Sequence, residues 1–542
     1  MAEARPNGRE PDPQPARHTA ARVSVGSHGG AGPVKPIAFV LSPVGRALVL
    51  LAFLLLVRAI TFGTTVINAD EEVFALAARE VLNGYLPYER LFDVKPVGST
   101  LLLALAFKLL GLSIATVRLV GVACVWAAAT TLAMLAARGG LGRLGAVFAG
   151  LIFIAYSTMM SGLATMTETL LIPFTILAVW LLHRALDPMP FRARLGLVAG
   201  AGVACGAAVL VKILPIVPGG LVAMLVCGLL VVRRQATVGQ ALALVASFGV
   251  LAVLPMAVAA GVHWQRGVLD QFLFANFGFA RAYTAIHPAL GVQAGRLATV
   301  VDAVWPLGVL AAVGAGAVLL SWRREKRVDD LGLMACAWLV GELASSSATL
   351  QFYPYYFLTT IPPLAVLSLV GIRALATWAR ADRQRVMALL ATGVVLVGVE
   401  HGEVDFLRDR AARGDPSRRI AAVIRRDAGG RTPTLFVTSY ELQSLYLLTG
   451  APLPPTRFAL PLHLMSLHGK VAGIDSLREI NRVLASRPDY IVTDESEHHP
   501  QWAMAPLRPV LAHGYRPIWG EGTIRLYRAV ARSAVPAAPV SG

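Results

Sequence analysis

An acidic stretch, INADEEVFALAAREVLNGYLPYERLFDVKPVGS at residues 67–99, directly follows an apolar run. Its carboxylates are Asp70, Glu71, Glu72, Glu80, Glu89 and Asp93. A carboxylate within hydrogen-bond reach of a hydroxyl can act as a general base, and several carboxylates together suit a hard divalent ion. A simpler interpretation also fits. Val73, Ala77 and Val81 lie along one side of a predicted helix, with Asp70 as its N-cap and the next acids stabilising its first turn.

The composition of the whole chain indicates an integral membrane protein. Hydrophobic residues make up 56% of the 542 residues, charged residues only 15%, and the mean hydropathy is +0.62. One soluble core could not hide so much apolar surface. The net charge of +17 would suit a nucleic-acid binder. However, Lys and Arg fall mostly between apolar segments, which favours a role in membrane topology and argues against a nucleic-acid partner.

The cysteines do not predict a disulfide framework or a metal site. All of them lie inside apolar segments, where a thiol behaves as a small hydrophobic group. They are Cys124, Cys205, Cys227 and Cys336.

The apolar segments and the basic stretches between them predict a multi-pass topology. A helix needs roughly 20 apolar residues to cross a bilayer, and cytoplasmic loops collect Lys and Arg. The basic stretches are 137–143, 183–194, 233–235, 322–327 and 373–385. Two apolar segments separate each stretch from the next, so all of them can lie in the cytoplasm. The predicted spans, about 11, are 47–68, 117–136, 144–160, 168–184, 195–212, 214–232, 239–262, 297–321, 331–349, 355–376 and 386–401.

This topology places the N-terminus in the cytoplasm and the acidic stretch on the extracytoplasmic side of a plasma or inner membrane. The helix predicted after Asp70 should then lie on the outer membrane surface. The apolar stretch at 97–111 is short for a span. If it crossed the membrane, the later basic stretches would move outside. We therefore predict an interfacial or re-entrant helix there.

The remaining segments give the domain organisation. Residues 1–45 are rich in Pro, Gly, Ala and Arg and lack the layout of a cleavable signal, which predicts a disordered cytoplasmic tail. Residues 46–402 form the transmembrane region, with a first external loop at 69–116. Residues 403–530 predict a small external α/β domain, in which TLFVT and YIVTD are strands and SLREINRVLAS is an amphipathic helix. Residues 531–542 predict a disordered tail.

Three motifs in the acidic stretch carry a family resemblance. They are the Asp70-Glu71 pair, Gly84-Tyr85-Leu86-Pro87-Tyr88 and Lys95-Pro96. The stretch resembles the first external loop of GT-C type, polyprenol-phosphate-sugar-dependent glycosyltransferases. These enzymes resemble glycosyltransferase family 39, and they include protein O-mannosyltransferases and lipid A aminoarabinose transferases. Val97 stands where the family has a second proline.

The resemblance implies a fold and an activity. The fold would be a GT-C-like α-helical polytopic membrane protein with a small C-terminal α/β domain. The enzyme would be a glycosyltransferase that moves a hexosyl or pentosyl group from a polyprenyl-phosphate donor to a lipid, glycan or protein acceptor on the extracytoplasmic side.

The resemblance also implies catalytic roles. Asp70 would be the general base that takes the proton of the acceptor hydroxyl. Glu71 would orient Asp70, raise its basicity or help to hold a cation. The leaving lipid phosphate needs positive charge more than a strong acid, and Lys95 is the nearest cation in the sequence. One displacement with one base predicts inversion at the anomeric carbon.

Further residues are candidates for binding the donor or its phosphate. They are Arg118, Glu168, Lys212, Arg281 and Tyr356. Four of them have a structural alternative: a helix N-terminal acid for Glu168, snorkelling for Lys212, and ordinary interface composition for the segments around Arg281 and Tyr356. A divalent cation would suit Asp70, Glu71 and Glu168, but their spacing does not demand one, so the sequence assigns no cofactor.

Two other functions fit the pattern less well. Transporters and lipid flippases usually show internal repeats and broken midplane helices, whereas the ionisable residues here gather at one surface. A polymerase or ligase with a diphosphate-linked donor would centre on a large late external loop. Since no glycine-rich loop joins a strand to a helix, a soluble nucleotide-sugar donor is disfavoured. The sequence leaves the identity of the sugar and of the acceptor open.

Overall fold

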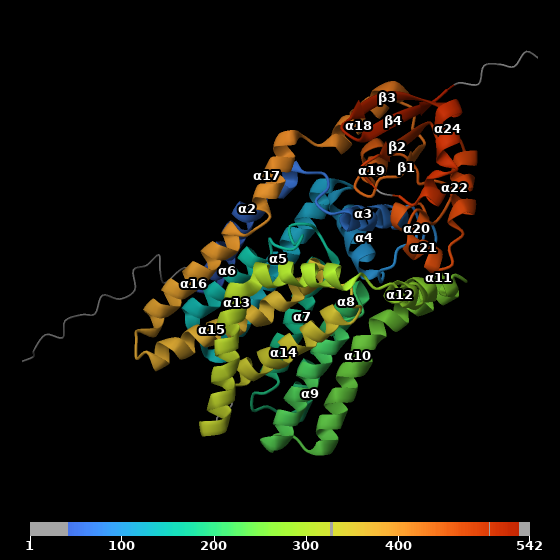
Figure 1. Cartoon of the computed structure of the whole chain (residues 1–542). Coiled ribbons are helices and arrows are strands. Elements are labelled where there is room, and N and C mark those ends of the chain that lie inside the picture. The colour runs from blue at the N-terminus through green and yellow to red at the C-terminus, as the bar shows by residue number, and fades with distance from the viewer. Residues whose placement is uncertain (1–41, 326–328, 498, 531–542) are drawn as a thin grey trace, which may run out of the picture.

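A computed structural model describes residues 42–325, 329–497 and 499–530. The two predicted tails, 1–45 and 531–542, lie outside this range apart from residues 42–45. The described chain forms a bundle of long helices with an α/β domain over one of its ends (Figure 1).

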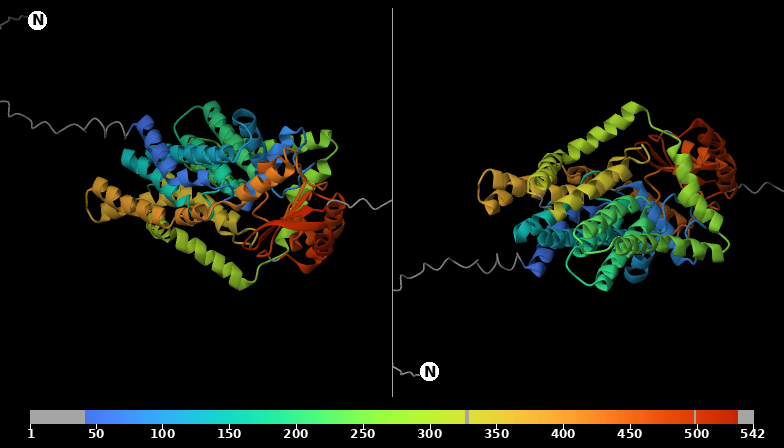
Figure 2. Two further views of the ribbon diagram at one scale, coloured as in Figure 1. Left: turned by 90° about the horizontal axis from the view of Figure 1, so that it is seen from above. Right: turned by 90° about the horizontal axis from the view of Figure 1, so that it is seen from below.

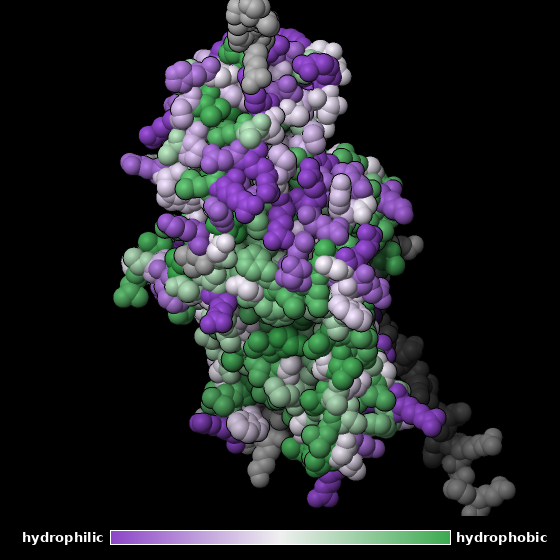
Figure 3. Space-filling view, turned by 90° about the vertical axis from the view of Figure 1, so that its right-hand side faces the viewer, coloured by the Kyte–Doolittle hydropathy of each residue, from purple (hydrophilic) through white to green (hydrophobic). Residues whose placement is uncertain are grey.

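The bundle has a helix at each of the predicted spans. These helices are α2 (Pro43–Arg58), α5 (Ile114–Ala136), α6 (Gly142–Tyr156), α7 (Thr167–Arg184), α8 (Phe191–Val211), α9 (Ile216–Val232), α10 (Val238–Gln265), α13 (Leu290–Glu325), α14 (Asp330–Ser347), α15 (Ile361–Trp378) and α16 (Arg383–Glu400). By length and composition, 6 helical stretches among the described residues can cross a membrane. Figure 3 shows hydrophobic side chains covering the bundle below a hydrophilic α/β domain. The chain is a mostly helical, multi-pass membrane protein.

Polar contacts join the basic stretches at one end of the bundle. Neighbouring loops are connected by the ion pairs Arg138–Asp187, Arg233–Asp330 and Arg373–Asp329. Arg194 donates to the carbonyl of Gln235 at 2.8 Å. These contacts bring four of the basic stretches, 137–143, 183–194, 233–235 and 373–385, to one end of the bundle; their cytoplasmic side stays a prediction. Seen from above and below, the long α13 runs along one side of the molecule (Figure 2).

At the other end, the first loop contains α3 (Ala69–Leu82) and α4 (Gly98–Leu110). Asn68 is the N-cap of α3, because its Oδ1 accepts from the Asp70 amide at 3.0 Å. The alternative that made Asp70 the N-cap is therefore wrong. Helix α4 has 13 residues and packs on α3. At 1.5 Å per residue it is about 20 Å long, short of the roughly 30 Å hydrocarbon core, which favours the non-crossing interpretation.

Helix α3 is buried on two sides by other parts of the protein, and its place at the outer membrane surface stays a prediction. Phe74 and Ala78 pack with α4 and the start of α5, while Leu76 and Ala77 pack with the α/β domain. Polar contacts strengthen the second interface. The Glu72 carboxylate accepts from the amides of Gln443 (3.2 Å) and Ser444 (2.7 Å). Arg79 donates to the carbonyls of Tyr446 (3.0 Å) and Ala451 (2.9 Å). The helix is therefore held between bundle and domain.

The α/β domain contains a sheet of four strands, in the order β1-β2-β4-β3. The two predicted strands are β1 (Leu435–Val437) and β2 (Tyr490–Asp494), and they pair in parallel. Helix α22 (Ser476–Ala485) is the predicted amphipathic helix. The sequence analysis missed the antiparallel hairpin of β3 (Tyr515–Glu521) and β4 (Ile524–Ala529). The other helices are α17 (Val404–Arg413), α18 (Pro416–Ala428), α19 (Leu445–Thr449), α20 (Pro461–Leu464), α21 (Leu467–Val471), α23 (Gln501–Met504) and α24 (Leu507–Gly514).

Candidate active site

Asp70 and Lys95 form an ion pair beneath the α/β domain. Asp70 lies in the first turn of α3, Lys95 lies in the loop between α3 and α4, and Nζ is 2.8 Å from Oδ2. Their side chains are only 20% and 18% exposed. The ammonium also lies 5.0 Å from the centre of the Phe74 ring. Burial lowers the pKa of Lys95, but the carboxylates of Asp70 and Asp93 outweigh burial and raise that pKa above its ordinary value. Lys95 is therefore a cation at neutral pH.

Asp93 is a second buried carboxylate beside Lys95. Its Oδ1 accepts from the Val94 amide at 2.7 Å, and its buried Oδ2 has no hydrogen-bond partner in the described part of the chain. Burial raises the pKa of Asp93 to about 6; the nearby Lys95 opposes this rise and Asp70 adds to it. The sequence analysis assigned no role to Asp93, although its place just before Lys95 in the acidic stretch could have drawn attention to it.

A second ion pair joins Glu168 to Lys212. Lys212 ends α8, and its Nζ lies 2.5 Å from Oε1 of Glu168 in the first turn of α7. Glu168 is fully buried, and Thr167 Oγ1 donates to its Oε2 at 2.8 Å. The Lys212 ammonium lies 3.8 Å from the centre of the Tyr356 ring in η4 (Pro354–Thr360), a cation–π contact. Lys212 is thus held by Glu168 and Tyr356 instead of snorkelling toward water.

The two ion pairs are neighbours. The start of α4 packs against the end of α8, since a Cβ on Gly98 would lie 2.7 Å from the Val211 amide nitrogen. Only glycine permits this close approach. Gly98 lies three residues after Lys95, and Val211 directly precedes Lys212, so the contact brings the two lysine-bearing segments together. Tyr356 also acts electrostatically on Lys95.

These contacts unite five of the predicted site residues in one place. We call the set Asp70, Lys95, Glu168, Lys212 and Tyr356 the paired-charge site. It combines two carboxylates, two ammonium groups and one phenol.

Glu342 is a residue that the sequence analysis missed. It lies inside α14, is buried, and accepts from Trp338 Nε1 at 2.9 Å. Glu342, Glu168, Lys212 and Tyr356 line a cavity of about 20 Å³, large enough for about one water molecule. An acid in the middle of an apolar span is costly, and that cost could have singled it out.

Glu71 and Arg118 form a buried structural pair. The guanidinium of Arg118 makes two contacts with the Glu71 carboxylate, one of them at 2.8 Å. It also donates to the carbonyls of Thr61, Thr64 and Thr65. Glu71 accepts from the Thr165 amide as well, at 3.1 Å. This environment contradicts the predicted phosphate-binding role of Arg118, because its donors are already occupied. The pair instead fixes the start of α3 and hence Asp70.

Two further arginines, the buried Arg58 and the phosphate candidate Arg281, make no contact with the paired-charge site among the described residues. Arg58 donates to the carbonyls of Ser157 (3.2 Å) and Gly162 (2.6 Å), which supports a structural role. Arg281 is exposed on α12 (Phe279–Thr284). No contact recorded for the described residues brings it to the paired-charge site, so we leave it out.

A divalent cation at the predicted carboxylates stays a prediction. Asp70, Glu71 and Glu168 each have their own cationic partner. Among the described residues no group of three His, Cys, Asp or Glu side chains could hold a metal.

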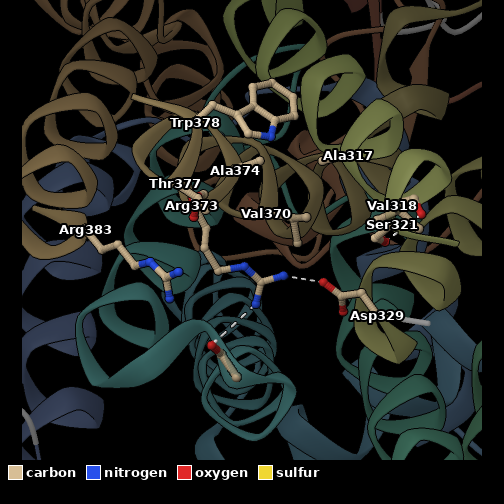
Figure 4. A pocket seen from close by; sticks show the side chains of 11 residues that line it. Ala317, Val318, Ser321, Asp329, Val370, Arg373, Ala374, Thr377, Trp378 and Arg383 are labelled. Atoms are coloured by element: carbon tan, nitrogen blue, oxygen red, sulfur yellow. Dashed lines mark hydrogen bonds and ion pairs between the residues drawn. The ribbon is translucent and has the colours of Figure 1, made fainter. Parts of the chain in front are cut away.

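A larger cavity, of about 620 Å³, lies at the end of the bundle with the basic stretches. Arg373 and Asp329 form an ion pair there, and Trp378 and Arg383 also line it (Figure 4). Helix α14 has 18 residues and starts beside this cavity, while its other end lies near the paired-charge site. At 1.5 Å per residue, the two places are separated by roughly 25 Å.

Comparison with known proteins identifies the fold. No protein-family model matches the chain, and no curated protein matches it. A solved structure of ArnT from Cupriavidus metallidurans bound to undecaprenyl phosphate superimposes with a TM-score of 0.63 at 16% sequence identity, covering 91% of this chain and 99% of that chain. The apo structure of the same protein gives 0.62 at 17% identity, covering 90% and 98%. The chain therefore has a GT-C-like fold, similar to that of ArnT over nearly its whole length.

Proposed function

We propose that the chain is a membrane glycosyltransferase. It would transfer a sugar from a polyprenyl-phosphate donor to a hydroxyl of a lipid, glycan or protein acceptor. The observation that carries this proposal is the paired-charge site, where two carboxylates and two ammonium groups lie together at one end of a GT-C-like bundle. The likeness to a structure that contains undecaprenyl phosphate supports the choice of donor.

In the proposed mechanism, Asp70 is the general base. The acceptor oxygen attacks the anomeric carbon while the Asp70 carboxylate takes its proton. The bond between that carbon and the phosphate oxygen breaks, the electron pair leaves with the lipid phosphate, and the configuration inverts. Neither a cofactor nor a covalent intermediate is required.

Lys95 and Lys212 would stabilise the departing phosphate. Ammonium groups already in place when charge develops lower the barrier without reorganising solvent. Lys95 bonds Asp70 at 2.8 Å in the structure. A donor phosphate that draws the Lys95 ammonium toward itself would therefore also release the carboxylate for its role as base. Donor binding and base activation are then one event.

We also propose the topology that the basic stretches favour. With these stretches in the cytoplasm, the paired-charge site and the α/β domain lie on the extracytoplasmic side of the cell membrane. A donor whose lipid is embedded in the membrane would reach the site from the bilayer, and the acceptor would arrive beneath the α/β domain.

The Asp70→Asn variant tests the function. Cells without the gene, and cells complemented with the native chain or the variant, are compared by mass spectrometry of envelope glycans and lipids. We expect the native chain to restore one sugar modification and Asp70→Asn not to restore it, at equal membrane abundance. Asp270→Asn, at an exposed position outside the site, is the matched control and should restore the modification. Full modification by Asp70→Asn would overturn the assignment of the base. An unchanged envelope without the gene would count against the function.

A further inference from the structure

A groove separates the start of α5 from the α/β domain. It has a volume of about 470 Å³, within the usual range of ligand pockets. Its lining includes Leu112, Ile114, Arg418, Arg425, Leu447 and Leu448. We call it the α5–α18 groove. None of the residues of the paired-charge site lines it.

The groove lies beside the start of a helix that is able to span a membrane. Ile114 opens α5, which belongs to a stretch that is long and apolar enough to span a bilayer. The chain just before it carries leucines that the protein leaves uncovered: Leu109 is 72%, Leu110 62% and Leu112 47% exposed. Lipid is the natural cover for such side chains beside a spanning helix. Because Leu112 also lines the groove, the groove borders on lipid.

Two arginines give the groove a positive charge. Arg418 and Arg425 come from the same face of α18, and both are exposed. Arg425 donates to the carbonyl of Leu448 at 3.3 Å, and no ion pair involves it within the described residues. The Nε of Arg418 bonds the Thr65 hydroxyl at 3.1 Å and lies 3.5 Å from the Asp415 carboxylate. Most of the guanidinium donors therefore stay available to an anion.

Apolar lining and arginines whose guanidinium donors are largely available together suit one kind of molecule. Guanidinium groups pair with phosphate through strong, charge-assisted hydrogen bonds. Leucine and isoleucine side chains at the membrane boundary suit a hydrocarbon chain instead. We propose that the α5–α18 groove binds an anionic phospholipid of the surrounding bilayer. The phosphate lies between Arg418 and Arg425, and an acyl chain leaves over Leu112 and Ile114 into the membrane.

Such a lipid would couple the two parts of the protein. Arg418 and Arg425 belong to the α/β domain, whereas Leu112 and Ile114 belong to the membrane region. Ile114 also lines a small neighbouring cavity together with Glu71 and Glu72. The bound lipid would tie the domain to the bundle next to the base of α3. This inference does not depend on the proposed sugar transfer.

The experiment measures the thermal stability of the purified full chain in neutral detergent. Phosphatidylglycerol, phosphatidylcholine or inorganic phosphate is added over a range of concentrations. We expect phosphatidylglycerol to raise the unfolding midpoint and the other two to leave it unchanged. In the Arg425→Gln variant, about tenfold more phosphatidylglycerol should be needed for the same rise, because one charge-assisted hydrogen bond is lost.

Arg426→Gln is the matched control. It removes the same charge from the next residue of the same helix, which is exposed and does not line the groove. This variant should respond to phosphatidylglycerol as the native chain does. Equal loss of response in both variants would mean that the lipid acts through general charge, and would overturn the site. A response of the native chain to phosphatidylcholine, or to inorganic phosphate alone, would overturn the choice of an anionic lipid as occupant.

Discussion

Lys95 forms an ion pair of 2.8 Å with Asp70, and the phenol of Tyr356, which contacts Lys212, also acts electrostatically on Lys95. This position makes Lys95 the link between the two halves of the paired-charge site.

Replacing Lys95 by Ala should weaken donor binding and slow transfer together. The change removes a preorganised cation from the departing phosphate, a loss of roughly 10²–10³ in rate by analogy with other electrostatic stabilisers. The measurement is binding of a polyprenyl phosphate and transfer by the purified chain. Lys108→Ala, an exposed lysine in α4, is the control and should retain both. Normal kinetics in Lys95→Ala would refute the phosphate role.

Asp93 should make the folded state less stable as the pH rises. Its pKa is raised from 3.8 to about 6, so the folded protein holds this proton more tightly than the unfolded chain does. The stabilising effect is complete below pH 4 and is lost as the pH rises through about 6. Asp93→Asn should therefore be more stable than the native chain at pH 8, by an order of 1–3 kcal/mol, with little difference near pH 4.

Unfolding midpoints of the native chain and Asp93→Asn, measured between pH 4 and 8, check this expectation. The same stability difference at every pH would show that the carboxylate does not titrate in this range. Because the Asn side chain has a similar shape, packing is not expected to account for a pH-dependent difference.

Lys212→Met should destabilise the protein more than the double variant with Glu168→Gln. The single change leaves a fully buried carboxylate without its cation, at a cost of about 3–5 kcal/mol. The second change removes that charge and should recover a large part of the stability. Donor binding should stay low in both variants, because the ammonium is absent from both. A double-mutant cycle of unfolding free energies, with donor binding measured in parallel, separates the two effects.

Gly98→Ala should weaken the packing of α4 on α8. The added methyl group would meet backbone atoms of Leu210 and Val211 at 2.6–2.7 Å, which forces the two helices apart. We expect a loss of about 1–3 kcal/mol in stability and weaker donor binding, as Lys95 moves away from Lys212. Gly196→Ala in α8, which meets no atom within 4 Å, should be neutral or slightly stabilising. Similar results for both variants would contradict a close approach at Gly98.

The sequence predicted the helices because long apolar runs are a strong local signal, and it singled out two residues that the fold brings into contact. Long apolar runs marked the helices of the bundle, and four of the basic stretches lie together at one of its ends. Asp70 and Lys95 were found through the motifs of one acidic segment. Their contact joins residues close in the sequence, where a loop of modest length suffices to bring them together.

Other features needed the folded chain. Arg118 had the residue type and place of a phosphate ligand, but only the structure shows Glu71 and three carbonyls using its donors. Glu342 stood alone in an apolar run. Its hydrogen-bond donor, Trp338, carries no charge, so the sequence pattern did not indicate that the two side chains interact. Helix α3 looked amphipathic, but its pattern could not show that the α/β domain would cover it.

The interface between α3 and the α/β domain has a mechanical consequence. Glu72 and Arg79 hold the segment from Gln443 to Ala451, and the same rigid helix carries Asp70 at its start. A tilt of the outer domain, such as one caused by an arriving acceptor, would turn α3 as a lever and shift the proposed base relative to Lys95. The ability of the Asp70 carboxylate to accept a proton would thereby depend on whether an acceptor is bound beneath the α/β domain.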